Sequence, residues 1–276
     1  MNKKLLVLIF SNFLNAELIL EITQGTEDPY RVALVQFEGN KNISKNINEI
    51  IRNNLTRSGE FKIFGNDDLI SNPSDETEVI FNDFKILDID YLILGKIIEE
   101  GAGISVIYEI YDINMSKKIR TSTVFGIPNK NRQLSHYISD GIYEEITGIK
   151  GISSTKILYV TEKDNFNLVI ADADGSNEQI LLKSNDPIIS PSWSPDSKKV
   201  AYVSFETGMA KVYIQNIATG KRELAIENSS QISSPSLSPD GKFLSLTMYQ
   251  DGNAEIYILN LKNKKIEILG TEGIES

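Results

Sequence analysis

The stretch SPSWSPD, which begins at Ser190, returns as SPSLSPD, which begins at Ser234. A near-copy 44 residues later is a repeat, and repeats of this length indicate stacked units that each bury an apolar face against the next. Each copy ends in a tight reversal: proline presets φ, aspartate tolerates the next position, and the serine or glycine that follows fits the last. The repeat predicts β-propeller blades of four short antiparallel strands, rather than a β-sandwich with a chance repeat.

Strand-like segments around the turns keep the same spacing. KVYIQN, which begins at Lys211, aligns with EIYILN, which begins at Glu255. LVIAD, which begins at Leu168, aligns with the same segment one repeat earlier. Three units are therefore predicted, beginning near residues 155, 198 and 242. Because propellers usually close with about four to eight blades, we expect an incomplete propeller. Such a chain is either a fragment of a longer protein, which we favour, or one whose open edges need partners.

The first half of the chain has helical as well as strand periodicity. Apolar residues at spacings of three and four predict one helix over residues 43–58 and a second over residues 132–147. Apolar runs predict strands at residues 31–37, 61–64, 91–98, 104–111 and 118–125. This order predicts a small α/β domain over residues 26–150. The Gly/Ser-rich joint GIKGISST then leads into the partial propeller, residues 151–276.

The N-terminal segment MNKKLLVLIFSNFLNA, residues 1–16, has the pattern of a signal peptide. Lys3 and Lys4 precede a short apolar run, and Ala16 offers a small residue at a cleavage site. The run is too short to cross a bilayer, and no later segment is apolar for long enough, so no membrane span is expected. We predict export, with a buried first strand or helix as the alternative. The next segment, ELILEITQG at residues 17–25, alternates weakly and predicts an edge strand or a free extended arm.

The composition excludes several classes of function. A net charge of −10 and a pI near 4.8 argue against a nucleic-acid partner, which requires a basic surface. The absence of cysteine excludes thiol catalysis, zinc–thiolate sites and disulfides, and a single histidine excludes a zinc site built on several histidines. No phosphate-binding loop or GxSxG motif occurs, and GAG at residues 101–103 predicts a hairpin turn. We therefore expect no catalytic residue, no metal and no cofactor.

Two polar features could still be sites. Asp172, Asp174 and Glu178 have part of the spacing of a cation-binding loop, but the closing glutamate is missing, so a solvated hairpin is expected. His136 has no identifiable serine or cysteine partner, which favours a packing or capping role over catalysis. Aromatic residues of the repeats could form a binding face, but the favoured role is filling between blades for Tyr202, Tyr213 and Tyr257.

Four segments carry a family resemblance. They are YEEITGIKG at residues 143–151, ILYV at 157–160, SPSWSPDSKKVAYVSFETG at 190–208 and SPSLSPDGKFLSLT at 234–247. Behind an α/β domain, they resemble the TolB family of periplasmic proteins of the bacterial Tol–Pal system, over essentially the whole chain. The resemblance implies a six-bladed propeller, of which this chain holds about three blades. One departure is that the second unit has Leu237 where the first has Trp193.

The resemblance also implies a non-enzymatic periplasmic adaptor. In such a protein, the C-terminal domain of the inner-membrane protein TolA recognises the arm, which strand addition would suit, and the lipoprotein Pal binds one rim of the propeller. The adaptor serves outer-membrane integrity and constriction at cell division, and colicins exploit it. The arm residues carried over are Glu17, Leu18, Ile19, Leu20, Glu21, Ile22, Thr23 and Gln24. The rim residues carried over are Pro187, Ile188, Ile189, Gln231, Ile232 and Ser233.

Two other functions stay open at this point. Similar blades precede the hydrolase domain of prolyl-oligopeptidase-type serine peptidases, so the chain could be the propeller domain of a truncated peptidase. That function requires a GxSxG motif after the blades. A scaffold or solute-binding propeller is the third interpretation. The predicted signal peptide and the α/β domain in front of the blades favour the adaptor.

Overall fold

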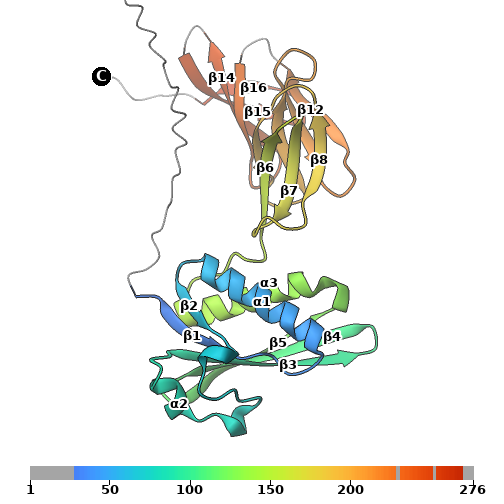
Figure 1. Ribbon diagram of the computed structural model, residues 1–276. Helices are drawn as coiled ribbons and strands as arrows, with labels where there is room; N and C mark the ends of the chain where they lie inside the picture. Colours follow the sequence, from blue (N-terminus) through green and yellow to red (C-terminus); the bar gives the residue numbers. More distant parts are fainter. Residues whose placement is uncertain (1–27, 228–230, 251–252, 270–276) are drawn as a thin grey trace, which may run out of the picture.

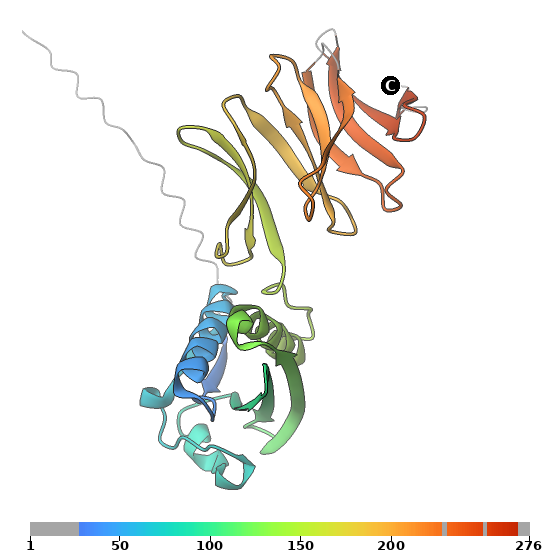
Figure 2. The same cartoon turned by 90° about the vertical axis from the view of Figure 1, so that its right-hand side faces the viewer.

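The computed structural model of the protein describes residues 28–227, 231–250 and 253–269. These residues form an α/β domain and, beyond the linker at residues 148–155, three antiparallel sheets that stand side by side without closing into a ring (Figure 1, Figure 2). The predicted fold class, an α/β domain followed by an incomplete β-propeller, is confirmed. The predicted signal peptide at residues 1–16 and arm at residues 17–25 lie outside the described residues.

The α/β domain contains two long helices, one short helix, three 3₁₀ turns (η) and five strands. In chain order they are β1 (Tyr30–Leu34), α1 (Lys41–Arg57), β2 (Phe61–Phe64), η1 (Asn66–Asp68), η2 (Glu76–Glu78), α2 (Phe81–Lys85), β3 (Tyr91–Glu100), β4 (Gly103–Asp112), β5 (Lys117–Gly126), η3 (Pro128–Lys130) and α3 (Asn131–Thr147). The predicted helices and strands agree with these bounds to within three residues. The sequence patterns did not predict α2, because five residues are too few to establish a helical period.

The five strands form one mixed sheet in the order β2-β1-β3-β4-β5. β1 is parallel to both β2 and β3, whereas β3, β4 and β5 pair antiparallel. β1 ends before the predicted residue 37, because a helix side chain takes over its bonds. Asn48 of α1 donates from Nδ2 to the Val35 carbonyl oxygen over 2.9 Å and accepts from the Phe37 N–H at Oδ1 over 3.1 Å.

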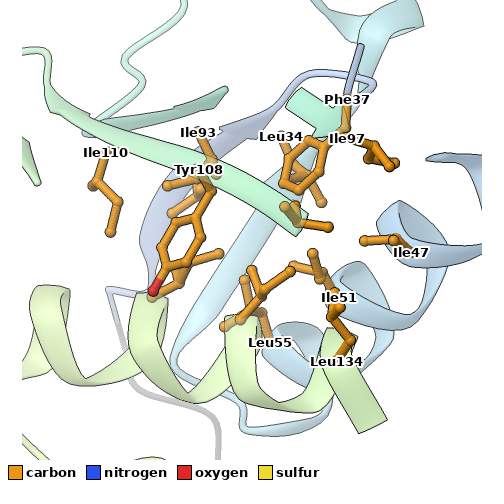
Figure 3. Packing of buried hydrophobic residues seen from close by; sticks show 14 of the residues in the cluster. Leu34, Phe37, Ile47, Ile51, Leu55, Ile93, Ile97, Tyr108, Ile110 and Leu134 are labelled. Atoms are coloured by element: carbon orange, nitrogen blue, oxygen red, sulfur yellow. The ribbon is translucent and has the colours of Figure 1, made fainter. Parts of the chain in front are cut away.

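The helices α1 and α3 cover one face of this sheet and bury the larger core cluster between them (Figure 1, Figure 3). Tyr108 and Ile110 of β4 point from the sheet toward the two helices, where they share the cluster with Leu55 of α1 and Leu134 of α3. Gly141 lets α3 approach closely, since a Cβ at this position would overlap the Tyr108 hydroxyl oxygen. Each fully buried side chain of this size stabilises the fold by roughly 1.5–3 kcal/mol relative to exposure.

The predicted helix ends are confirmed by their capping geometry. Asn40 caps α1, accepting from the Asn42 N–H over 3.1 Å. After α1, Gly59 has φ +77°, and after α3, Gly148 has φ +74°, a left-handed conformation that favours glycine. The second glycine turns the chain into the linker.

The described part of the propeller consists of three sheets. The first contains β6 (Lys156–Glu162), β7 (Phe166–Asp172) and β8 (Gln179–Ser184). The second contains β9 (Ile188–Trp193), β10 (Lys199–Ser204), β11 (Lys211–Asn216) and β12 (Arg222–Glu227). The third contains β13 (Gln231–Leu237), β14 (Phe243–Gln250), β15 (Asn253–Asn260) and β16 (Ile266–Ile268).

The second and third sheets do not begin where the sequence repeat predicted. The expected unit starts near residues 198 and 242 coincide with β10 and β14, the second strands of their sheets, whereas the start near residue 155 coincides with β6, the first described strand of the first sheet. The turn motif SPD connects the first strand of a sheet to the second, so a unit counted from the turn starts one strand late. Within the described residues, the first sheet has no counterpart of β9 and β13, and the edge of β6 away from β7 is unpaired.

The two SPD motifs form the predicted reversals. The Ser197 N–H donates to the Ser194 carbonyl oxygen over 2.9 Å, and Gly241 repeats this bond to Ser238 at the same distance. The fourth residues, Ser197 and Gly241, have φ values of +56° and +68°. In each turn the aspartate accepts from a serine hydroxyl over 2.7 Å, which closes the loop.

Neighbouring sheets pack face to face and are also joined by hydrogen bonds. Ser192 of β9 donates to the Pro235 carbonyl oxygen of β13 over 2.5 Å. Tyr202 is fully buried between the first two sheets, and its hydroxyl lies 2.9 Å from Gln215 Oε1. Gln215 Nε2 donates in turn to the Leu181 carbonyl oxygen of β8 over 3.1 Å. The predicted filling role is confirmed for Tyr202, and Tyr257 occupies the next space between sheets.

Candidate functional site

The predicted rim lies at the end of the propeller away from the α/β domain (Figure 1, Figure 2). The β7–β8 turn contacts α3, so β8 runs away from the junction and ends at the far side. Each following strand reverses direction, which places the start of both β9 and β13 at that far end. Pro187 and Gln231 therefore share one end of two adjacent blades.

The six rim residues differ in how much surface they offer. Ile188 and Ile232 are each 2% exposed and belong to the core between blades, so they support the rim without presenting a contact surface. Pro187 and Gln231 are exposed, and Ile189 is 37% exposed. Ser233 is half-buried.

Two further rim features were not predicted from the sequence. The loop between β10 and β11 is tied to the rim, because the Phe205 N–H donates to the Pro187 carbonyl oxygen over 3.0 Å. This loop presents Met209, which is 46% exposed. On the third sheet Tyr249, which is paired with Gln231 and is 44% exposed, adds an aromatic side chain. The only sequence signal was the position of both residues, at the ends of aligned strands.

The opposite end of the propeller contacts the α/β domain through one face of α3. We call this face the docking stripe; it consists of Arg132, His136 and Asp140, spaced four residues apart. Arg132 Nη2 contacts Asp174 Oδ2 and donates to Ser176 Oγ over 2.6 Å, both in the β7–β8 turn. Asp140 accepts from the linker N–H groups of Ser153 and Ser154 over 2.6 and 2.9 Å.

His136, the middle residue of the docking stripe, is 3% exposed and has a defined tautomer. Asn54 Nδ2 lies 2.9 Å from both His136 Nδ1 and Ser139 Oγ. The Ser139 hydroxyl donates to the Ser135 carbonyl, so it must accept from Asn54, and this fixes the orientation of the amide. His136 Nδ1 therefore accepts, and the proton of the neutral imidazole lies on Nε2.

The Nε2 of His136 faces two carboxylates without bonding either. Asp174 Oδ2 lies 3.8 Å away and Asp172 Oδ2 lies 4.0 Å away. Among the described residues, two buried nitrogen atoms without a hydrogen-bond partner lie here: Arg132 Nε and His136 Nε2. Both are donors about 4 Å from a carboxylate oxygen, so a small closing movement would complete their bonds.

The two carboxylates are not the solvated hairpin that the sequence predicted. Their side chains are 12% exposed for Asp172 and 8% for Asp174, so the prediction is wrong for these two residues, whereas Glu178 is exposed as expected. Burial alone would raise the pKa of Asp172, but hydrogen bonds from Lys156 over 2.6 Å and from Asn177 over 2.5 Å hold it below the ordinary value. Burial would likewise raise the pKa of Asp174. Hydrogen bonds from Ser176 and Arg132 outweigh this effect and hold the pKa below the ordinary value.

Three side chains here could together bind a divalent cation such as Zn²⁺, because their ligand atoms lie close to one another: His136, Asp172 and Asp174. The surrounding contacts do not fit that role. The Nε2 that faces the carboxylates carries the proton, and Asn54 cannot reverse without losing its bond from Arg57 and breaking the bond from Ser139 to Ser135. The charges of Asp172 and Asp174 are balanced by Lys156 and Arg132. This cluster is therefore a structural contact between domains rather than a metal centre.

The sequence also contains a signal for this junction. Leu134, Ile138, Ile142 and Ile146 step by four along the apolar face of α3, and that period predicted the helix. Arg132 and His136 belong to a second series with the same step, on the face that meets the propeller. The partners of this polar series lie some 40 residues further along the chain, so spacing alone could not identify them.

Comparison with known proteins places both halves of the chain in one family. A family model described as the TolB amino-terminal domain matches residues 18–119, and one described as the TolB beta propeller domain matches residues 143–275. The chain belongs to the TolB family. Relatives named Tol–Pal system protein TolB include that of Alcanivorax borkumensis, 44% identical over 214 residues, and that of Pseudomonas aeruginosa, 38% identical over 212 residues.

The TolB relatives are longer than this chain. The two alignments cover 75% and 74% of the chain but 49% of each relative, so the chain spans about half the length of the curated relatives it matches. The crystal structure of TolB from Acinetobacter baumannii is similar with a TM-score of 0.80 at 32% identity, covering 92% of this chain and 64% of that one. Within the described residues, no helix has both the length and the apolar composition to cross a bilayer.

Proposed function

We propose that the chain acts as a non-enzymatic periplasmic adaptor of the Tol–Pal system. It would be exported by the signal peptide at residues 1–16 and link the inner-membrane Tol complex, through TolA, to the lipoprotein Pal. In this role it serves outer-membrane integrity and constriction at cell division, and colicins would exploit it for import. The observation that supports this most directly is that both halves of the chain match the TolB family.

The proposed Pal-binding surface is the exposed part of the rim. It combines Pro187, Ile189 and Gln231 from the carried-over residues with Met209 and Tyr249, which lie at the same end of the blades. Interfaces are enriched in aromatic residues and methionine. The docking stripe of α3 contacts the opposite end of the propeller, so a partner at the rim would not compete with the α/β domain.

The proposed TolA-binding segment is the arm, Glu17 to Gln24. Strand addition would bind it through main-chain hydrogen bonds, with alternate side chains giving specificity. Other chemistry is not favoured, since the relatives are named as Tol–Pal system proteins rather than as peptidases.

The experiment is calorimetric titration of the purified chain with soluble Pal and, separately, with the TolA C-terminal domain. Ile189→Asp should weaken Pal binding by about tenfold or more, because a charge enters the proposed contact surface. The matched control is Ile180→Asp on β8, an exposed isoleucine away from the rim, which should leave the affinity within about twofold.

A chain that starts at Asp28 should lose the heat of TolA binding and keep that of Pal binding. Unchanged TolA binding would exclude the arm as the contact segment. Pal binding that is equally strong in Ile189→Asp and in Ile180→Asp would exclude this rim.

A further inference from the structure

The junction between the α/β domain and the first blade rests on few side chains. Arg132 contacts Asp174, Asp140 holds the linker, and His136 is buried between them. The chain contains a single histidine, and it stands at this junction. Histidine is the side chain whose ordinary pKa lies closest to neutral pH.

The charged groups that face His136 come from every element packed against it. The β7–β8 turn contributes Asp172 and Asp174, and α3 itself contributes Arg132. Lys156 at the start of β6 neutralises Asp172, while Arg57 at the end of α1 bonds Asn54 Oδ1 over 3.3 Å. The cations balance the carboxylates, so the junction has no uncompensated negative charge for an imidazolium.

The hydrogen bonds also oppose a charged imidazole. An imidazolium needs an acceptor at Nδ1 as well as at Nε2, but Nδ1 faces the Asn54 amide nitrogen, itself a donor. Reversing the amide would break its bond to Arg57 and would require the Ser139 hydroxyl to give up the Ser135 carbonyl. The docked arrangement therefore accommodates the neutral imidazole and disfavours the protonated one.

We infer that His136 makes the docking of the α/β domain against the first blade sensitive to pH, so that the docked arrangement holds at neutral pH and loosens in mildly acidic solution. Parting of the two domains would expose the imidazole to water, where it takes up a proton freely. The inference concerns this junction alone and does not depend on the proposed partners.

The sign follows from the direction of the shift. Burial lowers the pKa of His136 below its ordinary value of 6.5; Asp174 and Asp172 oppose this, and Arg132 and Arg57 add to it. Well above pH 6.5 the imidazole is neutral in both arrangements, so docking has no penalty. As the pH falls below that value, only the parted arrangement binds the proton, and its population rises by up to about tenfold per pH unit. Asp172 and Asp174 act in a lower window, because they lose their charge only below their ordinary value of 3.8.

The test uses the full chain with a pair of spin labels across the junction. Because the protein has no cysteine, Glu49→Cys on α1 and Asp186→Cys beyond β8 introduce two unique, exposed attachment points. Pulsed electron paramagnetic resonance should give one narrow distribution of the distance between the labels at about pH 7.5. At about pH 5.5 a second population with a different distance should appear. His136→Gln, which does not titrate, should abolish the second population. Tyr137→Phe, a change to the exposed neighbouring residue, should preserve it.

The inference would be overturned if the wild-type chain showed no displaced population at about pH 5.5, or if His136→Gln showed the same displaced population as the wild type. If His136→Gln does not fold, nitrogen NMR of the wild-type imidazole decides instead. The neutral ring should carry its proton on Nε2 and titrate below the ordinary value. A proton on Nδ1, or a midpoint at or above that value, would contradict the inference.

Discussion

Tyr202 packs between the first two blades and supports a hydrogen bond that joins them. Its ring is fully buried, and its hydroxyl reaches Gln215, whose amide nitrogen bonds a carbonyl of the preceding sheet. Burial raises the pKa of Tyr202 to about 12, so the hydroxyl remains protonated near neutral pH. Arg222 stacks on the neighbouring Tyr213, with its guanidinium carbon 4.1 Å from the ring centroid, and is paired with Glu206. The face between the first two blades is thus specified by polar contacts as well as by apolar packing.

Tyr202→Phe should lower the free energy of unfolding by about 1–3 kcal/mol, because Gln215 Oε1 loses its tyrosine partner while remaining buried. Urea denaturation followed by tyrosine fluorescence measures the change. Tyr159→Phe is the control, since that hydroxyl bonds the exposed Glu178 and its removal should change stability by less than about 0.5 kcal/mol. Equal effects of the two substitutions would show that the Gln215 bond contributes nothing specific.

The contacts of individual residues could be predicted from the sequence only where a local pattern determines them. The SPD turns follow from three adjacent residue types, and their bonds are as expected. The environment of Asp172 and Asp174 was predicted wrongly, because the side chains that bury them come from α3. A hairpin with two aspartates has the same sequence whether it faces solvent or another domain.

At the scale of elements, α3 has two functions set by two of its faces. Its apolar face packs on the sheet, and its docking stripe meets the linker and the first blade. Gly151 passes directly over this helix: a Cβ there would lie 2.5 Å from Asp140 Cα. The linker can follow this path only with glycine at that position.

Gly151→Ala should therefore destabilise the protein by about 1–3 kcal/mol, because the added methyl forces the linker away from Asp140. Thermal unfolding monitored by circular dichroism measures this loss. Gly103→Ala is the matched control, as its nearest neighbours would be 3.6 Å away, and it should change stability by less than about 0.5 kcal/mol. Unaltered stability in both variants would mean that the linker relaxes without cost.

The helices and strands were predicted well, because their periodicity is local. The grouping of the strands into sheets was predicted less well. The second and third blade units were counted one strand late, since the most conspicuous repeat element lies between the first and second strands of these sheets. The sequence also could not indicate that β1 ends early, because Asn48 of α1 replaces its partners from another element.

At the scale of the whole molecule, the described sheets leave an unpaired strand edge. β10 lies between β9 and β11, whereas its counterpart β6 pairs only with β7 in the described part of the chain. Hydrogen exchange should consequently be at least about tenfold faster for the amides of β6 that face away from β7 than for those of β10. Mass spectrometry of peptides from dilute protein measures the difference, and equal protection would mean that another segment covers β6.

Open edges also promote pairing between chains. Light scattering should therefore show association that increases with protein concentration, accompanied by slower exchange in β6. A monomer that stays stable across the same concentrations would count against this expectation.

Because charges are balanced at the domain junction, added salt and added acid should have different effects on the molecule. The chain carries a net charge of −10, so its surface charges repel one another and added salt should screen that repulsion. At the junction, Asp172 and Asp174 are already matched by Lys156 and Arg132 at close range, where dissolved ions screen weakly. Ionic strength should thus alter the colloidal behaviour of the protein while leaving the junction largely unchanged, whereas acid acts on the junction itself.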